Sequence, residues 1–231
     1  MALPRLNENP EYELEIPSTK QKVRFRPFLV KEEKVLMIAM ESDNQKDILN
    51  TVVNTITTCI NESIEKRNLT TFDVEYLFVQ IRAKSIGESV TLEGTCSACG
   101  HKQDVKLNLE TVTIDKVSED LEDTFEVGSG IKIKVKPMRF IDSTSVTEIN
   151  ITEIIGKMID TIYDDENLYN ASEYTKSDLD DFVNQLPRSV LTDIEKYIKG
   201  LPKLITTVEF VCEKCGHHNK YVLEGFQDFF V

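Results

Sequence analysis

The chain has 231 residues, of which 40% are hydrophobic and 29% are charged, so it can form one large domain or two small ones with real cores. Its 27 Lys and Arg residues stand against 40 Asp and Glu residues, which gives a formal net charge of −13. Because nucleic-acid affinity comes mostly from clustered basic side chains that neutralise phosphates, this balance argues against a nucleic-acid partner and against an anionic membrane surface.

Neither a bilayer-spanning apolar run nor a secretory signal is visible in the sequence. We therefore expect a protein that stays in a reducing cytoplasm, does not enter a membrane and binds other proteins or small ligands. In that compartment the five cysteines are not expected to form a disulfide framework.

The first half of the chain begins with a polar segment at 1–11, which we interpret as an extended N-terminal arm. Two alternating runs between residues 11 and 28 meet at Pro17-Ser18-Thr19, a hairpin signal. Apolar residues at helical spacing follow at 52–64 and again at 74–81, behind a Thr70-x-x-Asp73 cap signal. Strands are predicted at 88–95 and 103–109, on either side of a cysteine pair.

The second half repeats this order. Two alternating runs at 125–138 meet at Gly128-Ser129-Gly130, and both hairpins end in a proline, Pro27 and Pro137. Helices are predicted at 151–162, at 179–186 behind a Ser177-x-x-Asp180 signal, and at 190–200; strands follow at 204–211 and 218–223, around a second cysteine pair.

This order predicts an α+β fold built by internal duplication. The halves are 12–115 and 116–231, each a β-hairpin, a helical insert and a Cys-x-x-Cys β-hairpin, joined by an element that resembles a zinc ribbon.

The two cysteine pairs share one pattern, Cys96-x-x-Cys99-Gly100-His101 and Cys212-x-x-Cys215-Gly216-His217. Two residues between the cysteines let both sulfurs face one ion, and the following glycine can take the positive φ of a tight turn. Two such knuckles supply the tetrahedral shell of one structural zinc, so the predicted ligands are Cys96, Cys99, Cys212 and Cys215. A four-thiolate shell has no open position for substrate.

Other interpretations of these cysteines remain open at this stage. They include a redox-active dithiol, disulfides within or between the pairs, and buried thiols without metal. The histidines beside the knuckles, His101, His217 and His218, are expected to be solvated, although one of them could replace a cysteine ligand. Cys59 falls on the apolar face of a predicted helix and is expected to be a core thiol.

The sequence offers no catalytic centre. All three histidines stand beside the cysteine pairs, and no phosphate-binding glycine loop or metalloprotease motif occurs, so we expect no enzyme activity. The aromatic ending 225–231 is expected to fold back on the core or to dock on a partner.

Several segments give the sequence a family resemblance. The opening 42 residues and the cysteine pairs are similar to baseplate hub subunits and hub-assembly proteins of T-even-type contractile-tailed bacteriophages, most specifically at residues 16–19, 25–33, 72–76 and 81–85. The resemblance implies a non-enzymatic hub subunit or assembly chaperone that binds other hub and tail proteins. Self-association is a further option. It also implies a location in the host cytoplasm during assembly, with the tail baseplate of the virion as a later site.

The sequence thus supports one main hypothesis and two alternatives. The main one is a baseplate hub protein or assembly factor. A zinc-ribbon nucleic-acid or transcription accessory protein would require a basic stripe around the knuckles. The lysines there are opposed by acidic residues: Lys102, Lys106, Lys214 and Lys220 stand against Glu93, Asp104, Glu213 and Glu224. A dithiol redox protein would require an exposed, reactive cysteine.

Overall fold

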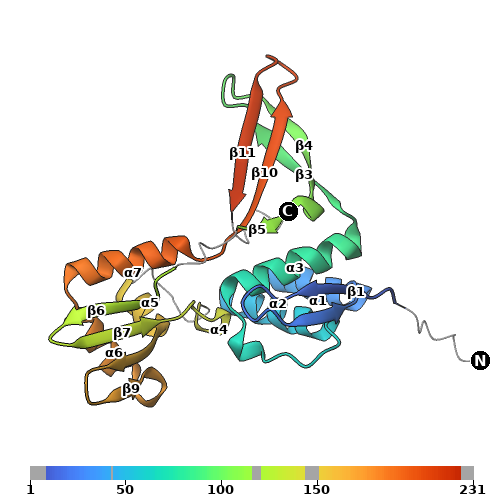
Figure 1. The fold of residues 1–231 in the computed structure, drawn as a ribbon. Helices are drawn as coiled ribbons and strands as arrows, with labels where there is room; N and C mark the ends of the chain where they lie inside the picture. The colour runs from blue at the N-terminus through green and yellow to red at the C-terminus, as the bar shows by residue number, and fades with distance from the viewer. Residues whose placement is uncertain (1–8, 43, 116–120, 144–150, 225–231) are drawn as a thin grey trace, which may run out of the picture. The chain divides into compact units, whose positions relative to one another are not determined.

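The structure is a computed structural model that describes residues 9–42, 44–115, 121–143 and 151–224. The chain divides into two compact units: unit 1 is Met1–Asp115 with Lys203–Val231, and unit 2 is Lys116–Pro202. Both units combine helices with small antiparallel sheets, which confirms the α+β class (Figure 1). Among the described residues, no helix has both the length and the apolar character needed to cross a membrane.

Unit 1 begins with the predicted hairpin, in which Tyr12 pairs with Phe25 and Glu15 with Lys22. Three helices follow, then two long hairpins and a short strand that pairs with the second of them. The elements are β1 Tyr12–Glu15, β2 Lys22–Phe25, α1 Val30–Met40, α2 Gln45–Cys59, α3 Thr71–Ile86, β3 Ser89–Thr95, β4 Lys102–Asn108, β5 Thr113–Ile114, β10 Leu204–Val211 and β11 His218–Glu224, with 3-10 turns at Lys66–Asn68 and Leu109–Thr111.

Helix α3 carries much of the unit 1 core. The predicted cap is present: Thr70 accepts a hydrogen bond from the Asp73 N–H, and the Asp73 carboxylate accepts one from the Thr70 N–H. Val74, Leu77 and Ile81 on α3 are fully buried. This apolar stripe anchors the helix, because burying such side chains stabilises the fold by about 1.5–3 kcal/mol each.

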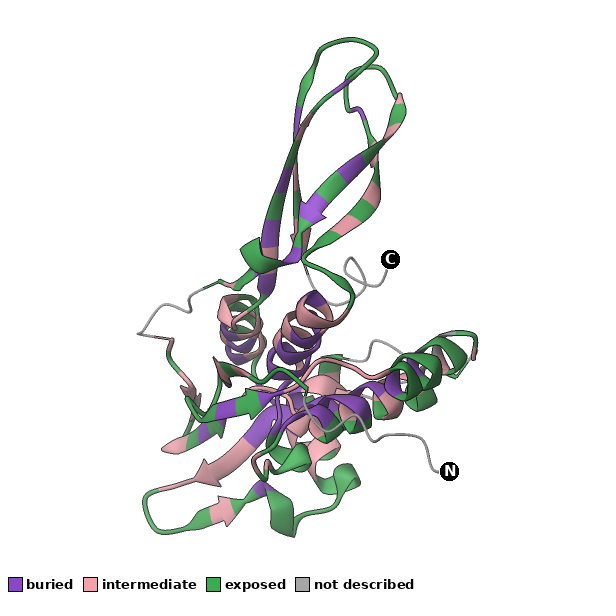
Figure 2. Cartoon of the chain, turned by 90° about the vertical axis from the view of Figure 1, so that its right-hand side faces the viewer, coloured by how far each residue is buried: buried purple, intermediate pink, exposed green. Residues whose placement is uncertain are grey.

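Four strands of unit 1 form the element that we call the ribbon: the hairpin β3–β4 and the hairpin β10–β11. The two hairpins lie side by side with their turns at the same end (Figure 1). Exposed and less exposed residues alternate along each strand, as expected for two layers that each turn one face inward (Figure 2). All four ribbon strands begin and end within one residue of their predicted bounds.

Unit 2 is a four-stranded antiparallel sheet, in the order β6-β7-β8-β9, packed with helices. Its core joins Ile133 of the sheet to Ile155 and Ile194 of two helices. The elements are β6 Thr124–Gly128, β7 Ile131–Val135, α4 Phe140–Ser143, α5 Ile151–Met158, β8 Ile159–Tyr163, β9 Leu168–Asn170, a 3-10 turn Ala171–Glu173, α6 Lys176–Asn184 and α7 Arg188–Gly200.

Two predictions for unit 2 were wrong in detail. The helix expected over 151–162 ends at Met158, and the chain continues as strand β8, because Ile159 and Ile162 pair with β7. The cap of α6 is Thr175 rather than Ser177, since Thr175 and Asp178 exchange the two capping-box hydrogen bonds.

The compact units do not have the bounds of the two sequence halves, 12–115 and 116–231. The hairpin β10–β11 belongs to unit 1, because Leu204 and Ile205 of β10 pair with β5, and the Asp115 N–H donates to Lys203 O at 2.9 Å. Unit 2 is therefore inserted between two paired strands of unit 1. Most of the expected N-terminal arm, residues 1–8, and the aromatic ending 225–231 lie outside the described residues.

Candidate metal centre

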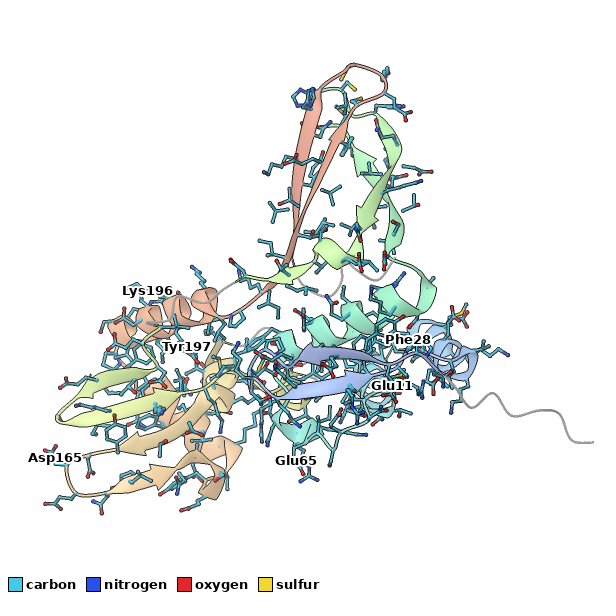
Figure 3. All side chains as sticks on the ribbon, turned by 45° about the vertical axis from the view of Figure 1, so that its right-hand side comes forward. Glu11, Phe28, Glu65, Asp165, Lys196 and Tyr197 are labelled. Atoms are coloured by element: carbon cyan, nitrogen blue, oxygen red, sulfur yellow. The ribbon has the colours of Figure 1, made fainter. Side chains whose placement is uncertain are left out.

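The two hairpin turns of the ribbon bring the four predicted cysteines together. The sulfurs of Cys96, Cys99, Cys212 and Cys215 all lie within 4.8 Å of one another, and sulfur atoms gather where the two turns meet (Figure 3). Cys96 Sγ lies 3.7 Å from Cys215 Sγ, and Cys99 Sγ lies 3.7 Å from Cys212 Sγ. We call this group the cysteine tetrad. It joins residues more than one hundred positions apart in the sequence.

Each knuckle has the same backbone geometry. In the first, the Cys96 N–H donates to His101 O at 2.8 Å and the Gly100 N–H donates to Cys96 O at 2.9 Å. In the second, the Cys212 N–H donates to His217 O at 2.9 Å and the Gly216 N–H to Cys212 O at 2.8 Å.

The knuckle glycines are required by the backbone. Their φ angles are +70° at Gly100 and +72° at Gly216, a region that side-chain-bearing residues rarely adopt. The two copies of the Cys-x-x-Cys-Gly pattern therefore form the same type of turn.

Packing between the hairpins holds the two turns against each other. Within the second hairpin, Phe210 of β10 stacks on Tyr221 of β11 with ring centroids 5.7 Å apart, and the Tyr221 hydroxyl donates to Thr95 O of the first hairpin. Gly94 of the first hairpin leaves the space that the Phe210 ring needs, since a Cβ there would lie 3.0 Å from Phe210 Cε1 and 2.6 Å from Val105 Cγ2.

Two amide side chains also cross between the hairpins. Gln103 bonds to the backbone at the second knuckle, and Asn219 bonds to the backbone at the first. The sequence analysis missed both residues, although a signal was present: Gln103 stands seven residues after Cys96, and Asn219 stands seven residues after Cys212.

Two thiols of the tetrad, Cys96 and Cys215, have pKa values shifted in opposite directions. Burial opposes ionisation of Cys96, but N–H groups of Cys99 and Ala98 and the Asn219 amide outweigh it and lower the pKa of Cys96 to about 6. At Cys215 the His217 N–H favours the thiolate, but the crowded neighbouring thiols raise the pKa of Cys215 to about 12. A cation bound among these sulfurs would favour the thiolate form that a metal ligand must take.

The sulfur spacing also fits a metal. Four sulfurs placed tetrahedrally about 2.3 Å from one ion lie about 3.8 Å apart, close to the two 3.7 Å separations seen here. A disulfide would need about 2.05 Å, and all five cysteines are free thiols. Among the described residues, the group of side chains that could hold a metal is the tetrad alone, so it includes no histidine.

Cys59 lies apart from this site. It is fully buried at the end of α2, and burial raises the pKa of its thiol to about 11. A protonated, buried thiol of this kind packs as a small apolar side chain, as the sequence predicted.

Comparisons with known proteins place the chain in a family. No curated protein and no solved structure matches it. Residues 9–231, nearly the whole chain, match the family described as T4 bacteriophage base plate protein. This match agrees with the resemblance noted in the sequence and covers both cysteine knuckles. The chain therefore belongs to the T4 bacteriophage base plate protein family.

Proposed function

We propose that this protein is a hub subunit of the phage tail baseplate, or a chaperone that helps hub proteins assemble, and that it acts through protein contacts without catalysis. The observation that carries the proposal is the tetrad: four thiols from two hairpins close on one another, so a bound ion would have no open position for substrate. Membership of a baseplate family supplies the biological setting.

The proposed ion is one structural zinc, held by Cys96, Cys99, Cys212 and Cys215. Thiolates are soft ligands that suit zinc and do not suit Mg²⁺ or Ca²⁺. When bound, the zinc would supply binding free energy that fastens β3–β4 to β10–β11. Elemental analysis of protein purified without chelators tests this: about one equivalent of zinc supports it, while iron or no metal contradicts it.

We also propose that the two halves arose by duplication, and matching hydrogen bonds support this. The Arg26 N–H donates to Cys59 O at 2.9 Å, and the Lys136 N–H donates to Met158 O at 2.8 Å. In both cases the donor directly follows the second strand of a hairpin and directly precedes a proline, and the acceptor is the buried last residue of a helix.

The residues next to these bonds correspond as well. Phe25 bridges to Ile60 in the first half, and Val135 pairs with Ile159 in the second. An experimental structure tests the duplication: the two hairpin–helix sets should superpose with Pro27 on Pro137, and different connections around these residues would contradict it.

The proposed partners are other hub and tail proteins, with self-association as a further option, and the proposed setting is the host cytoplasm during assembly. Affinity capture from infected cells, followed by mass spectrometry, tests this. A hub subunit should appear both in assembly intermediates and in mature virions, whereas a chaperone should appear only in the intermediates. Capture of neither hub nor tail proteins would contradict the proposal.

The alternatives are less well supported by the ribbon's chemistry. Two of its lysines are paired with acids: Lys102 Nζ lies 2.6 Å from Glu93 Oε1, and Lys220 Nζ lies 3.1 Å from Glu209 Oε1. We therefore expect no binding to duplex DNA at physiological salt, and micromolar affinity in a filter-binding or anisotropy assay would favour the nucleic-acid hypothesis. Turnover of a disulfide substrate that is lost on Cys96→Ser would favour the redox hypothesis.

A further inference from the structure

Gln103 and Asn219 make reciprocal contacts across the ribbon. Gln103 Oε1 accepts a hydrogen bond from the Glu213 N–H at 2.9 Å, and Asn219 Oδ1 accepts one from the Ser97 N–H at 3.0 Å. Glu213 and Ser97 each follow the first cysteine of a knuckle. The turn of each knuckle is thus held by an amide from the opposite hairpin.

The amide nitrogens complete the arrangement. Gln103 Nε2 donates to Val211 O at 3.1 Å, the residue just before Cys212, and Asn219 Nδ2 donates to His217 O at 3.1 Å. Asn219 Nδ2 also lies 3.6 Å from Cys96 Sγ, a contact of hydrogen-bond length for sulfur. The sequence positions match, but the roles are unequal: of the two amides, Asn219 is the one with a recorded bond to a sulfur.

We propose that Gln103 and Asn219 are positioning residues of the tetrad: they align the two knuckles before any ion binds, and Asn219 additionally orients the sulfur of Cys96. The inference rests on the proposed metal site. All of these bonds join protein atoms, so they do not require the ion in order to form. A site assembled in advance does not spend binding free energy on ordering its ligands, and hydrogen bonds to ligand atoms fix their orientation.

The expected effect is on metal affinity. Groups that orient metal ligands typically change affinity about 10–100-fold when they are removed. Gln103→Ala and Asn219→Ala should each weaken Zn²⁺ binding in this range, with the larger loss at Asn219. Asn219→Asp separates the two roles of Asn219, because the carboxylate still accepts from the Ser97 N–H but cannot donate to Cys96 Sγ. It should weaken binding more than Gln103→Glu does.

The experiment is a competition titration of the full chain with Zn²⁺ against a chromophoric chelator, together with the visible spectrum of the Co²⁺-substituted protein. Matched controls are Gln185→Ala and Asn170→Ala, amides of unit 2 that bond within their own segments. Unchanged Zn²⁺ affinity and Co²⁺ spectra in all four ribbon variants would overturn the inference.

A second measurement needs no variant. In wild-type protein stripped of metal, hydrogen exchange should find the amides of Ser97 and Glu213 protected, and rapid exchange at both would overturn the inference even if the metal site is real. Wild-type protein that fails to bind Zn²⁺ would instead contradict the proposed metal function, and protection at Ser97 and Glu213 would still support prior alignment of the knuckles.

Discussion

Asp73 accepts two hydrogen bonds from Ser18, at 2.9 Å from the backbone N–H and 2.6 Å from the hydroxyl. Ser18 lies in the turn between β1 and β2, 55 residues before the first turn of α3. The same carboxylate, which is fully buried, also accepts from the Thr70 N–H and hydroxyl. One side chain therefore caps α3 and fastens the first hairpin to it.

Replacement of Asp73 should destabilise unit 1. Asp73→Ala removes the acceptor for the buried N–H and hydroxyl of Thr70 and for two donors of the exposed Ser18, so the free energy of unfolding should fall by about 3 kcal/mol, measured by urea denaturation. Asp178→Ala is the matched control, because Asp178 fills the same capping position in α6 but is exposed. Asp178→Ala should lower the free energy of unfolding by about 1 kcal/mol. Equal losses in the two variants would contradict the role given to Asp73.

The ion pair of Arg26 and Glu32 should make unit 1 sensitive to acid. Burial opposes ionisation of Glu32, but the Arg26 guanidinium, 3.0 Å away, and the Leu29 N–H outweigh it, so the pKa of Glu32 lies below its ordinary value of 4.5. A carboxylate with a lowered folded-state pKa stabilises the fold above its unfolded-state pKa. That contribution is lost as the pH falls through the lowered value.

Glu32→Gln should therefore be less stable than wild type at pH 7 and should lose less stability on acidification below pH 4.5. Urea unfolding at several pH values in the presence of a chelator measures this without a contribution from metal release. Glu33→Gln, an exposed neighbour on α1, is the control and should keep the wild-type pH dependence. Parallel pH profiles for wild type and Glu32→Gln would rule out the pair as the cause.

Metal removal should affect unit 1 and spare unit 2. Structural zinc contributes about 10–16 kcal/mol in zinc-finger peptides, which is as much as the whole stability of many domains. After chelation, hydrogen exchange in β3, β4, β10 and β11 should become faster than in the metal-bound protein but stay slower than in an unfolded chain, because the hydrogen bonds between the hairpins remain, and exchange in α5 to α7 should stay unchanged. Cys99→Ser and Cys215→Ser should lower the thermal stability of unit 1 by similar amounts. A large difference between the two losses would show that one knuckle contributes more to stability than the other.

Gly94 should not tolerate a side chain. A Cβ there would lie 2.6 Å from Val105 Cγ2 and 3.0 Å from Phe210 Cε1, so Gly94→Ala should destabilise the ribbon by about 1–3 kcal/mol. Thermal melts of the metal-bound protein measure the loss. Combination with Val105→Ala should recover part of it by removing the nearest clash. A double variant that is less stable by the full sum of both losses would argue against this packing explanation.

Much of the fold follows from local sequence signals. The hairpin turns, the helix that ends at Gly200 and the ribbon strands around the cysteines were predicted within about a residue, because alternation, capping residues and glycines act over short distances. The tetrad was foreseeable because a repeated Cys-x-x-Cys-Gly pattern has few other uses.

The rest depends on contacts between distant segments. Ile159 and Ile162 fit a helical stripe as well as a strand, and only pairing with β7 decides between them. In the same way, nothing near β10 in the sequence indicates that it pairs with β5. Gln103 and Asn219 could have been found by aligning the two knuckles residue by residue, since both stand at the same offset from their own cysteines.

The hydrogen bond from the Asp115 N–H to Lys203 O brings together the points where the chain leaves and re-enters unit 1. A connection of a few residues could bridge these points, so unit 2 can in principle lengthen, shorten or be exchanged for another module without any change in the ribbon's register. Among phage relatives, differences in length and sequence would then be expected to accumulate in the segment between Asp115 and Lys203, while the cysteine tetrad stays constant.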